Sequence, residues 1–317
     1  MRPVLLVDGN HLARRSYFTV GRSLRTDKGK ASGVVYGTIN SLRKIAMKFN
    51  PCRMVVFFDG GHEAATKVYA AYKNNPTRNR DHEFYDQCLV VEELVEGMGL
   101  VKVKVDGVEA DTLIGVASRE LLPAYAKVLI VSSDHDMYQL LSSRVEIYDD
   151  LKSKAVTLAD LSACYIGCGP RDMIGLKVLM GDRSDNIPGL LGMGETTALE
   201  VLRQLGGYGG VRLLARRGCS MPDPSDFPSR MQFRITKAFA DPVAVRAIVK
   251  RNLRLVKIPT RADKLPTAVK REYLAQIGRQ PSVRIGVVTR VLKTYQINSI
   301  LGRAEEWIKP LVVAGGI

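Results

Sequence analysis

The chain has 317 residues, and 46% of them are hydrophobic, which is enough to bury a core in one large domain or two smaller ones. Its five cysteines are odd in number and scattered, which argues against a disulfide framework and against a zinc site. No run approaches the roughly 18 apolar residues of a membrane span, and no signal-peptide pattern opens the chain. We therefore expect a globular cytoplasmic protein without membrane contact.

The formal net charge of +15 is distributed unevenly. Residues 211–317 carry 21 Lys and Arg against 7 Asp and Glu, whereas residues 1–210 carry 26 against 25. This asymmetry indicates an acidic working site joined to a surface that attracts a polyanion, and nucleic acid fits that description best. The alternatives are a solvated basic face and a patch that binds another protein.

Several short apolar runs end directly in acidic residues. Runs so short and so rich in β-branched residues predict strands buried on both faces, as in a parallel sheet. Three of them are Val4–Val7 before Asp8, Met54–Phe58 before Asp59, and Val128–Val131 before Asp134 and Asp136.

Helical patterns alternate with these strands. Residues 33–49 have the apolar spacing of one helical face, and residues 108–121 open with Glu109 and Asp111 and continue as a second helix. Residues 101–105 alternate as a half-exposed strand. The alternation predicts an α/β fold with a mostly parallel, twisted sheet and helices on both faces.

Six carboxylates thus fall at strand ends or at a helix start, and the sheet topology could bring them to one rim. One Asp in such a place is most often a turn former or a helix cap. Six together would repel one another and raise each other's pKa, which is tolerable chiefly with cations present. Ligation by oxygen alone favours Mg²⁺ or Mn²⁺ over zinc, so we expect a pair of divalent ions.

A hairpin of two helices follows. A helix over roughly residues 170–181 runs into a turn rich in Asp, Asn, Pro and Gly, and a second helix starts at Gly194 or Glu195. Gly192 and Gly194 would allow backbone amides to approach a phosphate closely. The alternative is a simple helix end and tight turn. Asp182 and Asp185, just upstream, could join the metal site.

Taken together, five ordered motifs resemble the 5′ nuclease family of flap endonucleases and 5′-to-3′ exonucleases. The likeness is strongest to stand-alone bacteriophage 5′ nucleases and to the nuclease domain of bacterial DNA polymerase I, and it covers residues 1 to about 260. The motifs are Asp8-Gly9-Asn10, Phe57-Phe58-Asp59-Gly60, Gly107-Val108-Glu109-Ala110-Asp111, Ser133-Asp134-His135-Asp136 and Gly181-Asp182-Arg183-Ser184-Asp185-Asn186-Ile187-Pro188-Gly189.

The resemblance implies a PIN-like nuclease core over residues 1–165 and a helix-turn-helix DNA-binding subdomain over 166–260. We expect residues 261–317 to be a basic extension packed on the same domain. The resemblance also implies a K⁺ ion on backbone carbonyls of the 189–194 hairpin. All eight acids of the family are present: Asp8, Asp59, Glu109, Asp111, Asp134 and Asp136 for the more tightly held metal, with Asp134, Asp136, Asp182 and Asp185 toward the second.

Residues 62–98 interleave aromatic and basic side chains, a composition suited to stacking on unpaired bases and holding their phosphates. The resemblance implies a mobile helical arch here, through which a single-stranded 5′ end passes. Pro76 and the Asn74-Asn75 pair interrupt a continuous helix, so we expect part of the arch to be a loop until substrate orders it. The aromatic and basic residues are Tyr69, Tyr72, Lys73, Arg78, Arg80, Phe84 and Tyr85.

Within this segment, Tyr72 and Lys73 match the tyrosine-lysine step of the family's arch, and Arg78 or Arg80 its basic follower. We expect Lys73 to act near the scissile phosphate and Arg15 to bind a neighbouring phosphate. The alternative is an ordinary amphipathic surface helix. The residues expected to face the core are Cys88, Leu89, Val91, Val95 and Met98.

Basic residues also recur at helical spacing on residues 242–255, where Arg246, Lys250, Arg251 and Arg254 are expected to follow duplex DNA. A second helical stretch covers residues 285–295. None of the four histidines sits at metal-ligand spacing to another. His135 lies between two expected ligands, but alternation points it away, so we expect a structural or solvent-facing role.

The sequence thus predicts a Mg²⁺-dependent, structure-specific 5′ nuclease for DNA and RNA primers that cuts at 5′ flaps, nicks and 5′ ends. We expect a free-standing monomer of the bacterial cytoplasm, encoded by a host or a phage. One alternative is a phosphatase of the haloacid dehalogenase type, which needs a second Asp where Asn10 stands. The other is a DNA-binding protein without activity, which would gain by losing carboxylates next to phosphate.

Overall fold

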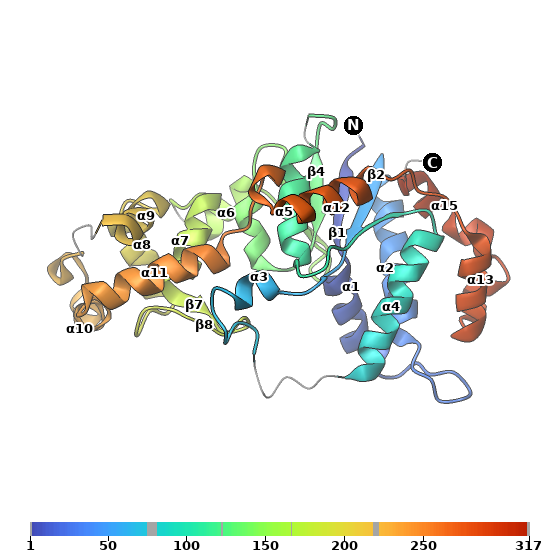
Figure 1. Ribbon diagram of the computed structural model, residues 1–317, viewed down its shortest axis with the longest axis horizontal. Helices are drawn as coiled ribbons and strands as arrows, with labels where there is room; N and C mark the ends of the chain where they lie inside the picture. Colours follow the sequence, from blue (N-terminus) through green and yellow to red (C-terminus); the bar gives the residue numbers. More distant parts are fainter. Residues whose placement is uncertain (1, 75–80, 122, 166, 218–221, 316–317) are drawn as a thin grey trace.

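A six-stranded sheet runs through the middle of the molecule in the order β3-β2-β1-β4-β5-β6 (Figure 1). The computed structural model describes residues 2–74, 81–121, 123–165, 167–217 and 222–315. All neighbouring strands of this sheet are parallel except β5 and β6. Its strands are β1 (Val4–Asp8), β2 (Arg53–Phe57), β3 (Val101–Val103), β4 (Val128–Val131), β5 (Val145–Asp149) and β6 (Lys154–Val156).

The central strands are buried on both faces, as their apolar runs predict. In β1, Val4 and Leu6 face one core cluster and Leu5 and Val7 face the other, because successive side chains of a strand point to opposite faces. All four are 0% exposed. The predicted α/β fold with a mostly parallel sheet is confirmed.

Helices cover both faces of the sheet. The face of Leu5 packs against α2, α4, α13 and α15, and the face of Leu6 packs against α5 and α12. The core on the Leu6 side continues from there into the helices α7 to α11. The helices before residue 170 are α1 (Gly9–Ser16), α2 (Gly33–Phe49), α3 (Glu63–Thr66), α4 (His82–Gly97), α5 (Ala110–Glu120) and α6 (Leu158–Cys164). Short helical turns of other types span Tyr17–Gly21, His135–Leu140, Pro224–Asp226 and Ala262–Lys264.

A second, largely helical part extends sideways from the sheet (Figure 1). It contains the predicted helical hairpin, with α7 before the turn and α8 after it, and a two-stranded ribbon within the turn. The long helix α11 packs on α7 and α9. The elements are α7 (Pro170–Met180), β7 (Gly181–Asp182), β8 (Ile187–Pro188), α8 (Glu195–Gln204), α9 (Tyr208–Arg217), α10 (Ser229–Ala238) and α11 (Pro242–Val256).

The last helices return to the six-stranded sheet and to the helices on the face of Leu5. They pack on α2, α4 and β2, and Trp307 and Leu311 are buried in the same cluster as Leu5. The N- and C-termini lie at the same end of the molecule (Figure 1). These helices are α12 (Thr267–Ile277), α13 (Ile285–Thr294), α14 (Asn298–Leu301) and α15 (Ala304–Gly315). Among the described residues, no helix combines the length and the apolar character needed to cross a membrane.

The segment expected to form an arch is divided. Residues 75–80, with Pro76, Arg78 and Arg80, lie outside the described residues. After them, α4 is a helix of the core in which Cys88, Val91, Val95 and Met98 are buried. The expectation for Leu89 is wrong: it is 60% exposed, because its position falls on the same side of α4 as the exposed Tyr85.

Candidate metal centre and nucleic-acid interface

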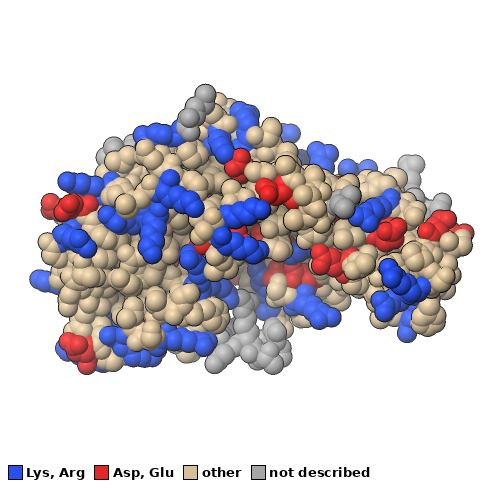
Figure 2. Space-filling view, turned by 180° about the vertical axis from the view of Figure 1, so that it is seen from behind, with Lys and Arg blue, Asp and Glu red and all other residues tan. Residues whose placement is uncertain are grey.

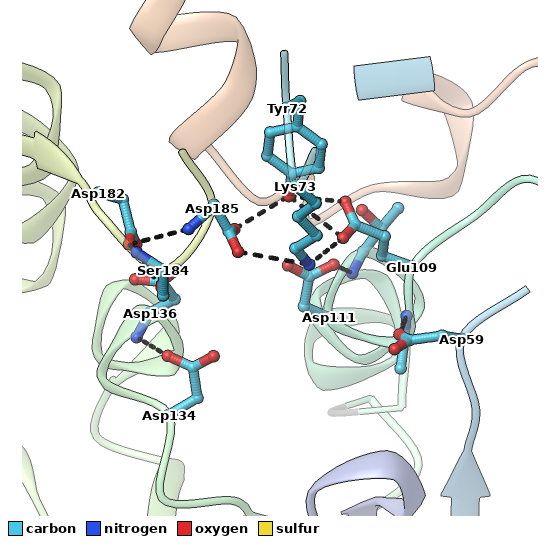
Figure 3. Close-up of polar contacts among 12 residues, drawn as sticks. Asp59, Tyr72, Lys73, Glu109, Asp111, Asp134, Asp136, Asp182, Ser184 and Asp185 are labelled. Atoms are coloured by element: carbon cyan, nitrogen blue, oxygen red, sulfur yellow. Dashed lines mark hydrogen bonds and ion pairs between the residues drawn. The ribbon is translucent and has the colours of Figure 1, made fainter. Parts of the chain in front are cut away.

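The eight acids predicted from the sequence gather at the carboxyl edge of the parallel sheet. Four of them end strands or follow within a few residues of a strand end, two lie at the start of α5, and two come from the turn after α7. Figure 3 shows all of them except Asp8. Because parallel strands all point the same way, residues distant in sequence meet at this edge. We call this group the acid cluster: Asp8, Asp59, Glu109, Asp111, Asp134, Asp136, Asp182 and Asp185.

Helix capping orients three of these side chains. Asp8 accepts a hydrogen bond from the His11 amide at 2.9 Å and so begins α1. Asp59 accepts one from the Ala110 amide at 2.9 Å, at the start of α5. Asp134 accepts one from the Asp136 amide at 2.8 Å. Each cap uses Oδ1 of its carboxylate, so capping and a place in the acid cluster are compatible.

Lys73 and Tyr72 lie against the acid cluster (Figure 3). The Lys73 ammonium forms an ion pair with Glu109 and lies 3.6 Å from Asp185. The Tyr72 hydroxyl lies 3.1 Å from both carboxylate oxygens of Glu109 and 3.0 Å from one of Asp185, so its single proton can be donated to either residue. Tyr72 is only 2% exposed, so in this arrangement its ring cannot stack on a base.

A second lysine, which the sequence did not indicate, serves the other side of the cluster. The Lys177 ammonium, from α7, forms an ion pair with Asp136 and donates to Asp182 at 2.6 Å. The signal in the sequence was a single basic residue near the end of an apolar helix, five positions before Asp182. The two ammonium groups therefore neutralise part of the cluster's charge.

Burial and mutual repulsion raise the pKa values of several carboxyl groups in the cluster. Burial, followed by repulsion from Asp59, raises the pKa of Asp8 to about 6. Burial and Asp134 raise the pKa of Asp136 to about 7, in spite of Lys177. Burial and Glu109 raise the pKa of Asp111 well above its usual range. The closely spaced carboxylates would stabilise a bound cation. Its binding would displace protons or lysine ammonium groups from them.

The pKa of Asp182 shifts in the opposite direction. Burial alone would raise the pKa of Asp182, but the charge and hydrogen bond of Lys177 outweigh it and lower the pKa. For Lys73 and Lys177, burial would lower the pKa, but the neighbouring carboxylates outweigh that effect and raise it. Both lysines are therefore charged at neutral pH.

Asp136, Asp182 and Asp185 form the most compact group, because each places one carboxylate oxygen within 4.8 Å of the others. A donor set made of carboxylate oxygens fits hard divalent cations. The expected division of the eight acids between two metals stays a prediction. Remaining acids are linked to this group through repulsion between neighbours, such as Asp111 with Asp136 and Glu109 with Asp185.

Beside the cluster lies a buried carboxylate that the sequence analysis missed. Asp150 follows β5. Its Oδ1 is hydrogen-bonded to His11 Nε2 at 2.8 Å, and its Oδ2 forms an ion pair with Arg15. Burial would raise the pKa of Asp150, but His11 and Arg15 outweigh it and hold the pKa below its usual range. The signal was present: β5 ends in Asp149 and Asp150 as other strands end in acids, but β5 itself has no continuous apolar run.

The hairpin leaves the start of α8 open. Gly192 has φ +74°, a conformation that favours glycine, and Gly194 immediately precedes α8. An added Cβ at Gly194 would meet nothing within 4 Å, and at Gly192 only Arg234 at 4.0 Å. Both glycines are exposed, so the backbone here is accessible to a phosphate.

Two of the four basic residues expected to follow duplex DNA instead hold the protein together. Arg251 donates to the Pro188 carbonyl at 2.7 Å and stacks over Tyr69 at 4.7 Å from the ring centre. Arg246 donates to the Arg216 carbonyl at 2.6 Å. Lys250 and Arg254 are exposed. Figure 2 shows acidic side chains gathered near the middle of one face, with Lys and Arg around them.

Other sequence predictions for single residues can be placed. His135 is exposed and stacks on Tyr138, with ring centres 4.7 Å apart, as expected for a residue that points away from the cluster. Asn10 accepts a hydrogen bond from the Asp59 amide at 2.8 Å. It therefore supports the β2 end and offers no second carboxylate after β1, as a phosphatase of the haloacid dehalogenase type would require.

Comparison with known proteins agrees with this architecture. Residues 3–165 match the sequence model of the 5′-3′ exonuclease, N-terminal resolvase-like domain. The chain is 31% identical over 205 residues to a 5′-3′ exonuclease of Buchnera aphidicola, covering 64% of this chain and 70% of that protein. It is 38% identical over 208 residues to the thermostable DNA polymerase I of Thermus filiformis, covering 64% of this chain and 24% of that protein. The chain thus spans about a quarter of such polymerases.

Solved structures share the fold. The T5 D15 protein co-crystallised with metal ions matches with a TM-score of 0.65 at 18% identity, covering 92% of this chain and 99% of that chain. Flap endonuclease-1 from Methanococcus jannaschii matches with a TM-score of 0.59 at 14% identity, covering 99% and 93%. This protein belongs to the 5′-3′ exonuclease family, and its fold is that of the PIN-like 5′ nucleases.

Proposed function

We propose that this protein is a structure-specific 5′ nuclease that hydrolyses phosphodiester bonds at 5′ flaps, nicks and 5′ ends of DNA, and at RNA primers. The observation that carries the proposal is the meeting of eight carboxylates and two lysines at one sheet edge. The family match and the accessible backbone of the 192–194 turn support it. Removal of primers during replication is the cellular role that fits such an activity.

We further propose that the acid cluster holds two Mg²⁺ or Mn²⁺ ions. Bound there, such ions would lower the pKa of a water, aim the resulting hydroxide at phosphorus and stabilise the leaving 3′ oxygen. The carboxylates of the chain hold cations rather than transfer protons. Asp136, Asp182 and Asp185 are the first candidates, because their oxygens are already close.

The lysines and Arg15 would act on the phosphate itself. Lys73, now paired with Glu109 and Asp185, would turn toward the scissile phosphate once cations take over those carboxylates. Arg15 would bind a neighbouring phosphate. The open turn at Gly192 and Gly194 would hold the duplex through its backbone, with a K⁺ ion on carbonyls of residues 189–194. Arg78 and Arg80 are proposed DNA contacts outside the described residues.

One assay tests the nuclease. A duplex with a labelled 5′ flap is incubated with the protein and Mg²⁺, with EDTA in place of Mg²⁺, and with the Asp134→Asn variant. We expect cleavage that leaves a 5′ phosphate with Mg²⁺, and none with EDTA. Asp134→Asn should bind the flap and cut it at least about 100-fold more slowly, since it removes a charge from the cluster while keeping the cap.

The same assay separates the alternatives. Asp86→Asn is the matched control, because Asp86 is exposed on α4 and does not belong to the acid cluster. Flap binding by the wild-type protein without any cutting would favour a DNA-binding protein without activity. Cutting that persists in EDTA and in Asp134→Asn would end the proposal of metal-dependent catalysis.

A further inference from the structure

Asp150 lies where an additional metal ligand would be expected. It follows β5, which is parallel to β4, so it reaches the same sheet edge as Asp134. Its side chain is only 3% exposed. Yet both of its oxygens are taken by α1: Oδ1 contacts His11 Nε2 at 2.8 Å, and Oδ2 pairs with Arg15. Asp150 is therefore committed to two side chains of the protein itself.

The two partners of Asp150 stand one helical turn apart. Positions 11 and 15 project from the same face of α1, so one carboxylate can meet both. His11 also donates its amide to Asp8 at 2.9 Å and lies 3.4 Å from Ser133 Oγ through Nδ1. The β5 end is thus tied to the helix that begins at the acid cluster.

The contact with Asp150 leaves other N–H groups of the Arg15 guanidinium available for a second partner. Its contact with Asp150 is through one terminal nitrogen, and its side chain is 30% exposed. A guanidinium has five N–H donors in a rigid fork, so the others remain for a second anion. An arginine fixed in advance loses less conformational freedom when it binds phosphate than a free one does.

We propose that Asp150 is a positioning residue, which holds the Arg15 guanidinium in place for a phosphate of the DNA strand beside the acid cluster. The inference rests on the proposed function, because it needs a bound nucleic acid. It extends that function by naming the residue that orients Arg15, whose contact with a phosphate is already part of the proposed function. Asp150 itself does not touch the substrate.

The test is binding rather than cleavage. Flap-duplex affinity is measured with Ca²⁺ in place of Mg²⁺ over a range of salt concentrations, for the wild type, Asp150→Asn, Arg15→Ala and the double variant. Each lost phosphate contact should lower the slope of log affinity against log salt by about 0.9. We expect Asp150→Asn and Arg15→Ala each to lower the slope by that amount and to weaken binding about tenfold. The double variant should be no weaker than Arg15→Ala.

Asp149→Asn is the matched control. Asp149 is also buried at the end of β5, but it accepts from the amides of Leu151 and Lys152 within its own turn. It should leave the salt slope unchanged. An unchanged slope in Asp150→Asn or Arg15→Ala, or losses that add in the double variant, would overturn the inference. Wild-type cleavage with Mg²⁺ is scored separately, so a failure of the proposed nuclease is distinguishable.

A second variant covers the case in which Asp150→Asn does not fold. Arg15→Lys keeps the charge, but its ammonium lacks the planar guanidinium that Asp150 can hold in a fixed orientation while the other N–H groups face a phosphate. It should bind the flap as weakly as Arg15→Ala. Wild-type affinity in Arg15→Lys would mean that a nearby charge suffices and that positioning by Asp150 plays no part.

Discussion

The ammonium group of Lys73 is paired with the carboxylate of Glu109, although 36 residues separate the two in the chain. Lys73 belongs to the segment that leads into residues 75–80, and Glu109 begins α5. Asp185 accepts the second contact of the same ammonium group. The pair therefore joins the base of the expected arch to the acid cluster, and it is broken only at the cost of leaving Glu109 without its cation.

Replacing Lys73 tests its place near the scissile phosphate. We expect Lys73→Ala to slow single-turnover cleavage of a flap duplex by about 100-fold, a loss typical of one cation or donor in the transition state. Duplex affinity measured with Ca²⁺ should change less than about threefold. Lys67→Ala, at an exposed site six residues earlier, is the control and should cut normally. Unchanged turnover in Lys73→Ala would remove Lys73 from the chemistry.

Lys177 should matter most when metal is absent. Lys177→Met leaves Asp136 and Asp182 without their cation, so we expect the metal-free protein to lose about 2 kcal/mol of unfolding free energy. Added Mg²⁺ should raise the melting temperature of this variant more than that of the wild type, because it replaces the missing charge. Lys264→Met removes a surface pair with Asp263 and should behave like the wild type. Equal Mg²⁺ shifts would contradict the prediction.

The raised pKa of Asp8 predicts how stability depends on pH. Between its usual value of 3.8 and about 6, the folded protein binds more protons at Asp8 than the unfolded chain does. In EDTA, Asp8 therefore lowers the free energy of unfolding as the pH rises through this range. Asp8→Asn removes the effect and can still cap α1. Its unfolding free energy relative to the wild type should increase by about 2 kcal/mol from pH 4.5 to 7.5.

Denaturant unfolding in EDTA at several pH values measures this difference, with Asp86→Asn as the control at an exposed carboxylate. A difference between Asp8→Asn and the wild type that stays constant with pH would show that Asp8 titrates normally. Saturating Mg²⁺ should cancel the higher unfolding free energy of Asp8→Asn. The wild type then gains stability from the metal bound by the Asp8 carboxylate, which the variant lacks.

The turn before α8 offers a test of backbone contact with DNA. Gly194 has φ −81° and open space around it, so Gly194→Asn should fold normally and supply a good helix cap. Its side chain would nevertheless stand where a phosphate must approach, and we expect duplex affinity to fall about tenfold. Gly302→Asn, at another exposed glycine with open space, should bind DNA normally. Normal binding by Gly194→Asn would place the phosphate elsewhere.

Much of the nuclease core could be predicted because local pattern and burial agree there. The apolar runs of β1, β2 and β4 and the helical spacing of α2 and α5 each allow one reading, and the acids mark where strands end. The hairpin of α7 and α8 was clear for the same reason, since glycine and proline separate two apolar helices. Strand β5 was missed because charged Glu146 interrupts its run.

The contacts within the site were less predictable, because they depend on which side chains meet across the fold. Lys177 lies on an apolar helix and looks like a solvated residue until α7 is placed against the turn His135–Leu140. Asp150 and His11 are 139 residues apart, and no local pattern links them. Tyr72 is an aromatic residue in a basic segment, which suggests stacking on a base. Its hydroxyl instead contacts Glu109 and Asp185, and its ring is buried.

Helices α13 and α15 pack on α4 and α2, so the smallest part of the chain that can fold by itself must include them. A Cβ at Gly315 would collide with the Gly99 carbonyl at 2.0 Å, and Trp307, Leu292 and Leu311 fill the layer over α2. Truncating the chain after the matched residues 3–165, or near residue 260, would remove that layer and expose the apolar surface of α2 to solvent. Expression of such fragments should give aggregates, whereas a minimal soluble version has to keep both ends of the polypeptide.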